Sequence, residues 1–187
     1  MDTSLLDKAI KFAVDAHHDS ERRGKGFPYI VHPLEAVAIV STMTPDQELL
    51  AAAALHDTVE DTDVTVEQIE KEFGPHIASL VEAETDKFLD TGDESATWRE
   101  RKAAGIEHIA AASLEVKIVA MGDKLSNMRA IARDYDEIGD SLWNRFHAPG
   151  GKADHEWRYR SLVESFSELA GTAAYAEFSA LVDKVFA

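Results

Sequence analysis

The apolar residues of this chain recur at three- and four-residue spacing almost from end to end, and this period constrains the fold more than any other feature. The first run places Leu6, Ile10 and Ala13 on one face, as in an amphipathic helix. A second run begins near Pro33, and a long third run spans 114–134 without a proline. We find no hairpin signal, internal repeat or low-complexity tract. The sequence therefore predicts an all-α helical bundle.

Capping signals predict several helix boundaries. In a capping box, a Ser or Thr is followed three residues later by Glu or Gln, and each side chain bonds a free backbone N–H of the first turn. The candidate boxes are Thr44 with Gln47, Thr65 with Gln68, and Thr97 with Glu100. Pro45 and Pro75 stand at expected first helical positions. The clearest loop is 148–151, and short helices over 161–170 and 175–185 are expected to finish the chain.

The charge balance argues against a nucleic-acid partner. The 187 residues include 19 Lys and Arg against 35 Asp and Glu, a net charge of −16. Most of the surface therefore repels a polyanion. A small phosphorylated substrate is still compatible, provided that a bound cation and a few local Lys or Arg residues invert the potential inside a pocket. The length suits one domain with a sizeable core.

Other chemistries and locations are excluded by what the sequence lacks. Without cysteine the chain forms no disulfide, thiolate zinc site or cysteine nucleophile. Its first residues contain no basic and apolar targeting segment, and no stretch approaches the roughly 18 apolar residues of a membrane span. We therefore expect a cytoplasmic protein without a membrane partner.

A compact group of imidazole and carboxylate side chains lies near the middle of the chain. His56 and Asp57 are followed by Glu60 and Asp61, with apolar residues around them. If the helix continued past Asp57, His56 would lie over Glu60. Neutral His with carboxylates suits Mn²⁺, Fe²⁺, Zn²⁺ or Mg²⁺. However, neighbouring side chains on an ideal helix point about 100° apart, so further ligands must come from elsewhere.

Two distant residues are candidates for the missing ligands. His32 lies at a junction between loop and helix, and Asp123 interrupts the apolar face of the long predicted helix. Each also has an ordinary structural interpretation, because His32 could cap a helix and Asp123 could pair with Lys124 or Arg129. The residues alone leave these interpretations open.

The order His, His-Asp, Asp resembles the HD metal-dependent phosphohydrolase superfamily. Three segments narrow the resemblance: RRGKGFPYIVHP at 22–33, ALHDTVEDT at 54–62 and GDKLSNMR at 122–129. They resemble the hydrolase domain of the RelA/SpoT alarmone proteins and the stand-alone small alarmone hydrolases of the Mesh1 type. The resemblance covers about 5–132. We therefore expect a single HD hydrolase domain over 1–187, in which 133–187 is a C-terminal helical extension.

The resemblance implies a reaction and the residues that perform it. It implies that one divalent ion, usually Mn²⁺ in this family, is bound by His32, His56, Asp57 and Asp123. It also implies that Glu60 and Asp61 are the catalytic carboxylates. The reaction of those relatives removes the 3′-diphosphate of (p)ppGpp as pyrophosphate and leaves GDP or GTP. A bound dication would lower the pKa of its water molecule, and these carboxylates would orient that water and accept its proton.

Substrate contacts are predicted on less specific grounds. Arg22, Arg23 and Lys25 form a dense basic cluster, and in the resembled family the position of Arg23 lies beside the nucleotide and can stack on its base. Relatives usually carry Lys directly after this Arg, whereas here Lys25 is the nearest candidate. Asn127 matches a position near the ribose. Tyr159 either packs the C-terminal segment onto the domain or forms a wall that stacks on the base.

Two alternatives to alarmone hydrolysis come from the same residues. One keeps the chemistry but changes the substrate, as in an HD-type nucleotidase or phosphatase that acts on another nucleotide such as an adenosine alarmone. The other is a non-catalytic sensor of a nucleotide or metal. The sensor is disfavoured because it would not need Glu60 and Asp61, which are both present.

Overall fold

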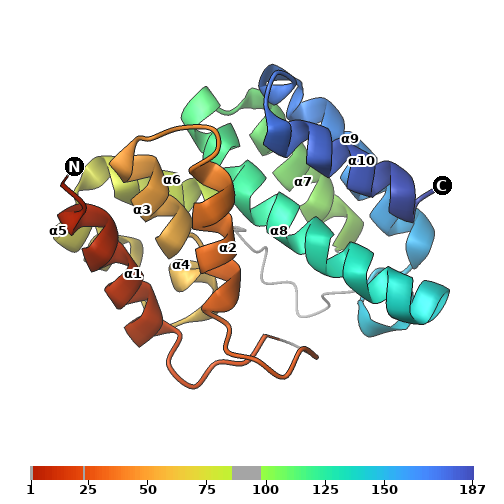
Figure 1. Cartoon of the computed structure of the whole chain (residues 1–187), viewed down its shortest axis with the longest axis horizontal. Coiled ribbons are helices and arrows are strands. Elements are labelled where there is room, and N and C mark those ends of the chain that lie inside the picture. Colours follow the sequence, from red (N-terminus) through yellow and green to blue (C-terminus); the bar gives the residue numbers. More distant parts are fainter. Residues whose placement is uncertain (1, 23, 86–97) are drawn as a thin grey trace.

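The computed structural model describes residues 2–22, 24–85 and 98–187, and the regular elements in these ranges are helical (Figure 1). This confirms the all-α prediction. The helices are α1 (Ser4–Ala16), α2 (Val31–Val40), α3 (Gln47–Leu55), α4 (Thr58–Asp61), α5 (Val66–Phe73), α6 (Pro75–Glu84), α7 (Trp98–Ala111), α8 (Leu114–Ile138), α9 (Lys152–Ser165) and α10 (Ala173–Val185). Two 3₁₀ segments, Gly139–Arg145 and Ser167–Leu169, join the last helices. No described helix is long and apolar enough to cross a membrane.

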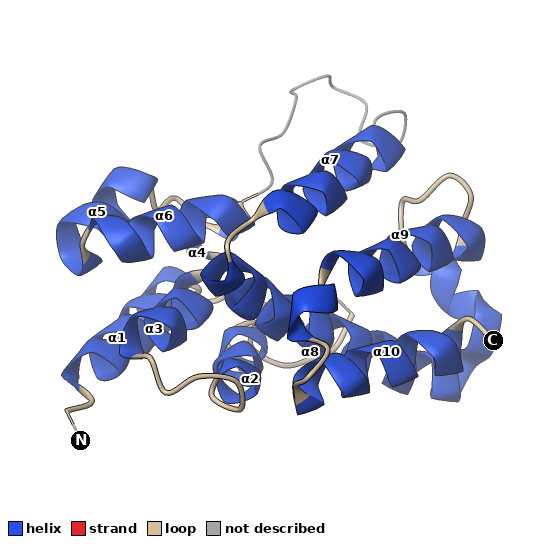
Figure 2. Cartoon of the chain, turned by 90° about the horizontal axis from the view of Figure 1, so that it is seen from above, coloured by secondary structure: helices blue, strands red, loops and turns tan. Residues whose placement is uncertain are grey.

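Helix α8 runs through the middle of the molecule and takes part in two hydrophobic clusters. Helices α1 to α6 lie on one side of it, and α7, α9 and α10 lie on the other (Figures 1 and 2). Val119 packs into the first cluster, which includes Leu55 and Ile77. Leu125 packs into the second, which includes Phe178. Residues of α8 that lie between its two buried faces are therefore held in place by helices on both sides of α8.

Helices α2 and α8 approach very closely at Gly122. A Cβ atom at this position would lie 2.7 Å from Cγ2 of Val40 and 2.9 Å from the carbonyl oxygen of Ala36. Real Cβ atoms do not tolerate such distances, so only glycine fits without a shift of α2. The close approach brings His32 of α2 near Asp123 of α8.

The helix does not continue from α3 into α4. It stops at Leu55, and Thr58 Oγ1 donates to the Leu55 carbonyl at 2.7 Å, which satisfies one acceptor of the helix end. Asp57 is the N-cap of the next short helix, and its carbonyl accepts from Asp61 N at 2.9 Å. His56 and Asp57 thus lie in a turn between two helices.

The capping predictions had mixed outcomes. Thr65 and Gln68 form the predicted capping box, with bonds of 3.3 and 2.8 Å. The prediction for Thr44 was wrong, because α3 begins after Asp46, whose side chain accepts from Glu48 N at 2.8 Å. Thr44 instead accepts from Asp46 N. The box at Thr97 lies outside the described residues.

Two other boundaries differ from the sequence-based expectation. Helix α2 begins at Val31, ahead of Pro33, and α9 begins at Lys152 rather than near 161. The first turns of α9 are polar and show no amphipathic period, so its start was missed. They are held by tertiary contacts, which include an ion pair of 2.6 Å between Arg99 of α7 and Asp154.

Candidate active site

Four side chains from three separate segments converge on one point. Nε2 of His32 lies 3.3 Å from Oδ2 of Asp57 and 3.0 Å from Oδ1 of Asp123. Nε2 of His56 lies 3.0 Å from Oδ2 of Asp57 and 3.7 Å from Oδ1 of Asp123. Bonds of about 2.1 Å to one ion place adjacent ligand atoms roughly 3.0 to 3.4 Å apart. The spacing of His32, His56 and Asp57 therefore suits a shared metal ion, and Asp123 lies against both histidines.

In the neutral form of both histidines, the hydrogen bonds at Nδ1 leave Nε2 as the atom with a lone pair. His56 Nδ1 lies 2.8 Å from the Ala53 carbonyl, which only accepts, so Nδ1 carries the proton. Ser126 Oγ donates to Glu35 at 2.7 Å and therefore accepts from His32 Nδ1 at 2.8 Å. The two Nε2 atoms then face each other at 3.3 Å. Two lone pairs beside two carboxylates call for a cation between them.

The buried charges of the site depend on one another. Burial lowers the pKa of His56, but Asp57 and Asp123 overcome this and raise it well above its usual value. Burial raises the pKa of Asp57 and His56 lowers it, with a net shift downward. For Asp123, Lys124 and the histidines likewise overcome burial and hold the pKa well below its usual value. The site thus keeps its carboxylates ionised and favours positive charge between them.

The turn between α3 and α4 explains why adjacent residues can act together. On a continuous helix, the side chains of His56 and Asp57 would diverge, yet here His56 Nε2 and Asp57 Oδ2 are 3.0 Å apart. Tyr29 Oη donates to the same Asp57 oxygen at 2.7 Å. The break in the helix is therefore part of the site.

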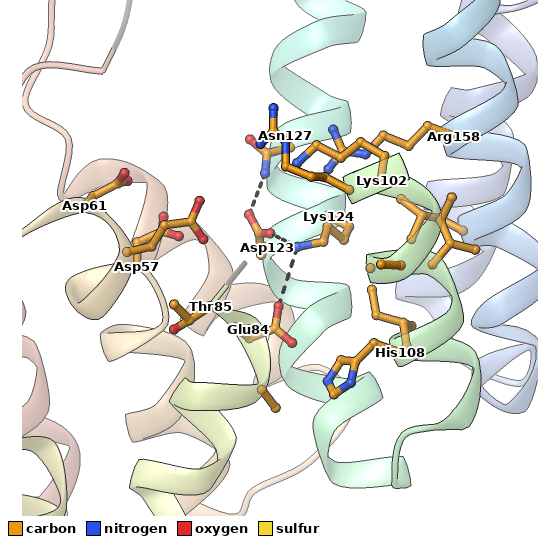
Figure 3. Close-up of a pocket in the computed structure, with 18 of the residues that line it drawn as sticks. Asp57, Asp61, Glu84, Thr85, Lys102, His108, Asp123, Lys124, Asn127 and Arg158 are labelled. Carbon is orange, nitrogen blue, oxygen red and sulfur yellow. Dashed lines mark hydrogen bonds and ion pairs between the residues drawn. The ribbon is translucent and has the colours of Figure 1, made fainter. Parts of the chain in front are cut away.

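A cavity of about 530 Å³ opens beside the four side chains. Glu60 and Asp61 line it, and Asp61 lies on the side of Asp57 (Figure 3). Asn127 lines it one turn beyond Asp123 and donates to that carboxylate, while its own oxygen accepts from Arg22 at 2.5 Å. The predicted ligands His32, Asp57 and Asp123, both predicted catalytic carboxylates and Asn127 therefore line one cavity.

The opposite wall of the cavity carries positive charge. Lys102 of α7 and Arg158 of α9 face the carboxylates from this wall (Figure 3). Lys124 of α8 lies between the two sides, where it pairs with Asp123 and, at 3.5 Å, with Glu84. An anionic ligand in the cavity would thus meet a metal ion on one side and cations on the other.

Comparison with known proteins places this arrangement in a family. A model of the HD domain matches residues 9–148. The chain belongs to the HD domain family. Membership implies dependence on a divalent metal ion, and His32, His56 and Asp57 offer ligand atoms that all lie within 4.8 Å of one another.

The relatives of this HD domain include proteins of very different length. The guanosine-3′,5′-bis(diphosphate) 3′-pyrophosphohydrolase MESH1 of Danio rerio is 37% identical over 134 residues, 70% of this chain and 71% of that protein. MESH1 of Xenopus tropicalis is 38% identical over 135 residues. The GTP pyrophosphokinase rsh of Brucella melitensis is 40% identical over 129 residues, but the match spans only 17% of that protein.

Solved structures show the same architecture. One, described as a metazoan ortholog of SpoT that hydrolyses ppGpp, matches with a TM-score of 0.74 and 27% identity over 100% of this chain and 96% of that protein chain. A protein of Listeria monocytogenes EGD-e matches with a TM-score of 0.71 and 28% identity over 86% of this chain and 97% of that protein chain.

Three predicted substrate contacts lie outside this cavity or outside the described residues. Lys25 pairs with Asp134 of α8 and does not line the cavity. Tyr159 is 3% exposed and stacks on Phe186 with ring centroids 6.1 Å apart, so the structure places it in the C-terminal core. Arg23 lies outside the described residues. Its neighbour Arg22 lines the cavity, with its guanidinium 5.2 Å from the Tyr29 ring centroid.

Sequence reasoning missed Lys102, Arg158 and Glu84. The Arg101-Lys102 pair was a basic signal on a predicted helix, but nothing in the sequence placed α7 beside the predicted metal ligands. Burial raises the pKa of Glu84 despite the nearby Lys124. The buried position of Glu84 follows from the packing of α6 on α8 and has no local sequence signal.

Proposed function

We propose that this protein is a metal-dependent hydrolase that removes the 3′-diphosphate of (p)ppGpp as pyrophosphate and leaves GDP or GTP. The observation that carries the proposal is one cavity beside four metal-competent side chains, which is lined by two further carboxylates and, on its other wall, by cations. The names and identities of the MESH1 relatives support the same substrate.

His32, His56, Asp57 and Asp123 would hold one divalent ion, and we propose Mn²⁺. The donor set fits, because two neutral imidazoles and two carboxylates without sulfur suit a borderline-hard dication. When bound, the ion supplies Lewis-acid polarisation of the phosphoryl group and a water molecule of lowered pKa. Tyr29 and Asn127 hold the two aspartates in place through their hydrogen bonds.

Glu60 and Asp61 would orient the attacking water and accept its proton. Both line the cavity next to Asp57 but lie outside the four-residue ligand set proposed above. Carboxylates in this position can act on water without competing for the ion. General base catalysis of this kind contributes about 10² to 10⁴ in rate.

A bis(diphosphate) carries anionic groups at two ends and needs a cationic partner for each. The 3′-diphosphate would meet the metal ion, and Lys102 and Arg158 would face the 5′-diphosphate across the cavity. Asn127 and Arg22 line the same cavity, are joined by a hydrogen bond and would contact the nucleoside. Arg23 is still proposed as a base contact. The overall charge of −16 supports a small nucleotide rather than a nucleic acid as the partner.

Product identification tests the proposal. Purified protein with Mn²⁺ is incubated with ppGpp, with an adenosine 3′-diphosphate and with ordinary nucleoside mono-, di- and triphosphates, and products are separated by anion exchange. We expect pyrophosphate and GDP from ppGpp, and loss of both in the Glu60→Gln variant. Orthophosphate as the main product would instead indicate a phosphatase. No turnover of any 3′-diphosphate would overturn the proposal.

A further inference from the structure

A continuous series of polar contacts leads from His32 to the C-terminal helix α10. His32 Nδ1 contacts Ser126 Oγ at 2.8 Å, and Ser126 Oγ contacts Glu35 Oε2 at 2.7 Å. The other oxygen of Glu35 accepts from Arg129 at 3.3 Å. Arg129 in turn donates two bonds of 2.7 Å to Glu177 of α10. Glu35, Arg129 and Glu177 do not line the cavity.

The direction of the first two bonds is fixed by chemistry. An ionised carboxylate only accepts, so the Ser126 hydroxyl must donate to Glu35. The hydroxyl oxygen is then left to accept from His32 Nδ1–H. With the proton on Nδ1, Nε2 presents its lone pair to the metal position. If Ser126 donated to His32 instead, the proton would move to Nε2 and block that position.

Glu35 can play this part only while its carboxylate is held. Its side chain is 26% exposed, and without a partner it could turn to solvent. Arg129 holds it, and Arg129 is itself oriented by the two parallel bonds to Glu177, the geometry in which guanidinium–carboxylate pairs are most directional. An exposed ion pair normally contributes little to stability. Here the ion pair between Arg129 and Glu177 lies at the end of the series, so it also holds the Glu35 carboxylate in place through Arg129.

We infer that Ser126, Glu35 and Arg129 are positioning residues for His32, and that Glu177 of α10 tunes metal affinity through them. The inference rests on the proposed role of His32 as a ligand. It gives the C-terminal helix a part in metal binding, although no side chain of α10 touches the site. Loss of such outer partners typically costs about 10-fold to 100-fold in metal affinity.

Two measurements without substrate test the inference. The first is the dissociation constant for Mn²⁺, obtained from the electron paramagnetic resonance signal of free ion. We expect Ser126→Ala and Glu35→Gln to weaken binding about 10-fold to 100-fold. Glu177→Gln is expected to weaken it about threefold. The second is the His32 Nδ1–H signal in nitrogen-15 NMR of the Zn²⁺-loaded protein, expected in the unsubstituted protein and lost or fast-exchanging in Ser126→Ala.

A matched control separates positioning from general destabilisation. Lys184 of α10 pairs with Asp136 of α8 at 2.6 Å, so Lys184→Gln removes a second ion pair between the same two helices without touching the series. We expect this variant to bind Mn²⁺ normally. Equal effects of Glu177→Gln and Lys184→Gln, or a His32 proton on Nε2 in the unsubstituted protein, would overturn the inference. Because neither readout involves turnover, failure of the proposed reaction would leave these results interpretable.

Discussion

The two sides of the cavity are built in different ways. The metal side draws on short, dense segments in which His56 and Asp57 are adjacent and Glu60 and Asp61 follow within one turn. The cationic wall draws single residues, Lys102 and Arg158, from α7 and α9. Under the proposed function, the residues for bond cleavage are largely concentrated in short motif segments, whereas retention of an anionic substrate depends on how the C-terminal helices pack against α8.

The largest effect is expected on the metal side. His56→Ala removes a ligand whose Nε2 is 3.0 Å from Asp57, so both Mn²⁺ binding and turnover should be lost, with turnover falling more than about 10³-fold. Metal content by mass spectrometry and pyrophosphate release measure the two effects. His18→Ala, at a side chain that is 75% exposed, is the control. Normal metal content in His56→Ala would contradict the assignment of His56 as a metal ligand.

A second substitution separates catalysis from metal binding within the same side. Glu60→Gln should lower kcat by about 10² to 10⁴ because it removes the proton acceptor, while Mn²⁺ affinity changes little. Single-turnover rates and direct metal titration measure each quantity. Asp63→Asn alters an exposed carboxylate of the same segment and should retain full activity. Weakened metal binding in Glu60→Gln would make Glu60 a ligand instead.

The cationic wall should respond differently. Arg158→Met removes a charge-assisted contact worth roughly 1.5 to 3 kcal/mol, so KM for ppGpp should rise about 10-fold to 100-fold with a small change in kcat. Arg160→Met is the matched control, because Arg160 lies on the same helix and pairs with Glu156 and Asp183 at the surface. A fall in kcat at unchanged KM would instead indicate that Arg158 acts in catalysis rather than in substrate binding.

The junction between α2 and α8 offers a smaller test. Gly122→Ala places a Cβ atom 2.9 Å from the Ala36 carbonyl, and such overpacking costs about 1–3 kcal/mol. Better helix propensity returns roughly 1 kcal/mol. We expect a lower free energy of unfolding in urea together with weaker Mn²⁺ binding, since α2 carries His32. Gly171→Ala, where a Cβ meets open space, should change neither.

The smallest effect is expected at His76, which lies outside both walls of the cavity. Hydrogen bonds that His76 donates to Glu48 and Glu115 raise the pKa of His76 above its usual 6.5. The resulting stability is complete below pH 6.5 and is lost as the pH rises through the higher folded pKa. The pair is exposed, so the contribution is below about 1 kcal/mol. His76→Gln should therefore lower Tm slightly at pH 6 and not at pH 9, whereas an equal decrease at both would contradict the assignment.

Much of the fold was predictable because helix periodicity is a local property. The capping box at Thr65 and the long helix α8 follow from side chains a few residues apart. The start of α9 was not predictable, since its first turn depends on Asp154 meeting Arg99 of another helix. Thr44 failed as a cap because Asp46, two residues later, offers its carboxylate to Glu48 N.

The candidate site also has a part that the local sequence predicted and a part that depends on tertiary packing. The motif segments indicated His56 and Asp57, but their convergence depends on a helix break that Thr58 supports through Leu55. Choosing among basic residues needed the tertiary structure: Lys25 lies near His32 in sequence but pairs with Asp134, whereas Arg158 lies far away in sequence and lines the cavity. Spacing in the sequence predicts chemistry within a segment, and packing between helices decides the rest.

The most direct test of this account is a crystal structure of the Glu60→Gln variant with Mn²⁺ and ppGpp. We predict one ion bound by His32, His56, Asp57 and Asp123, with the 3′-diphosphate on the ion and the 5′-diphosphate against Lys102 and Arg158. A nucleotide bound in the opposite orientation, or an ion held by other residues, would contradict the account.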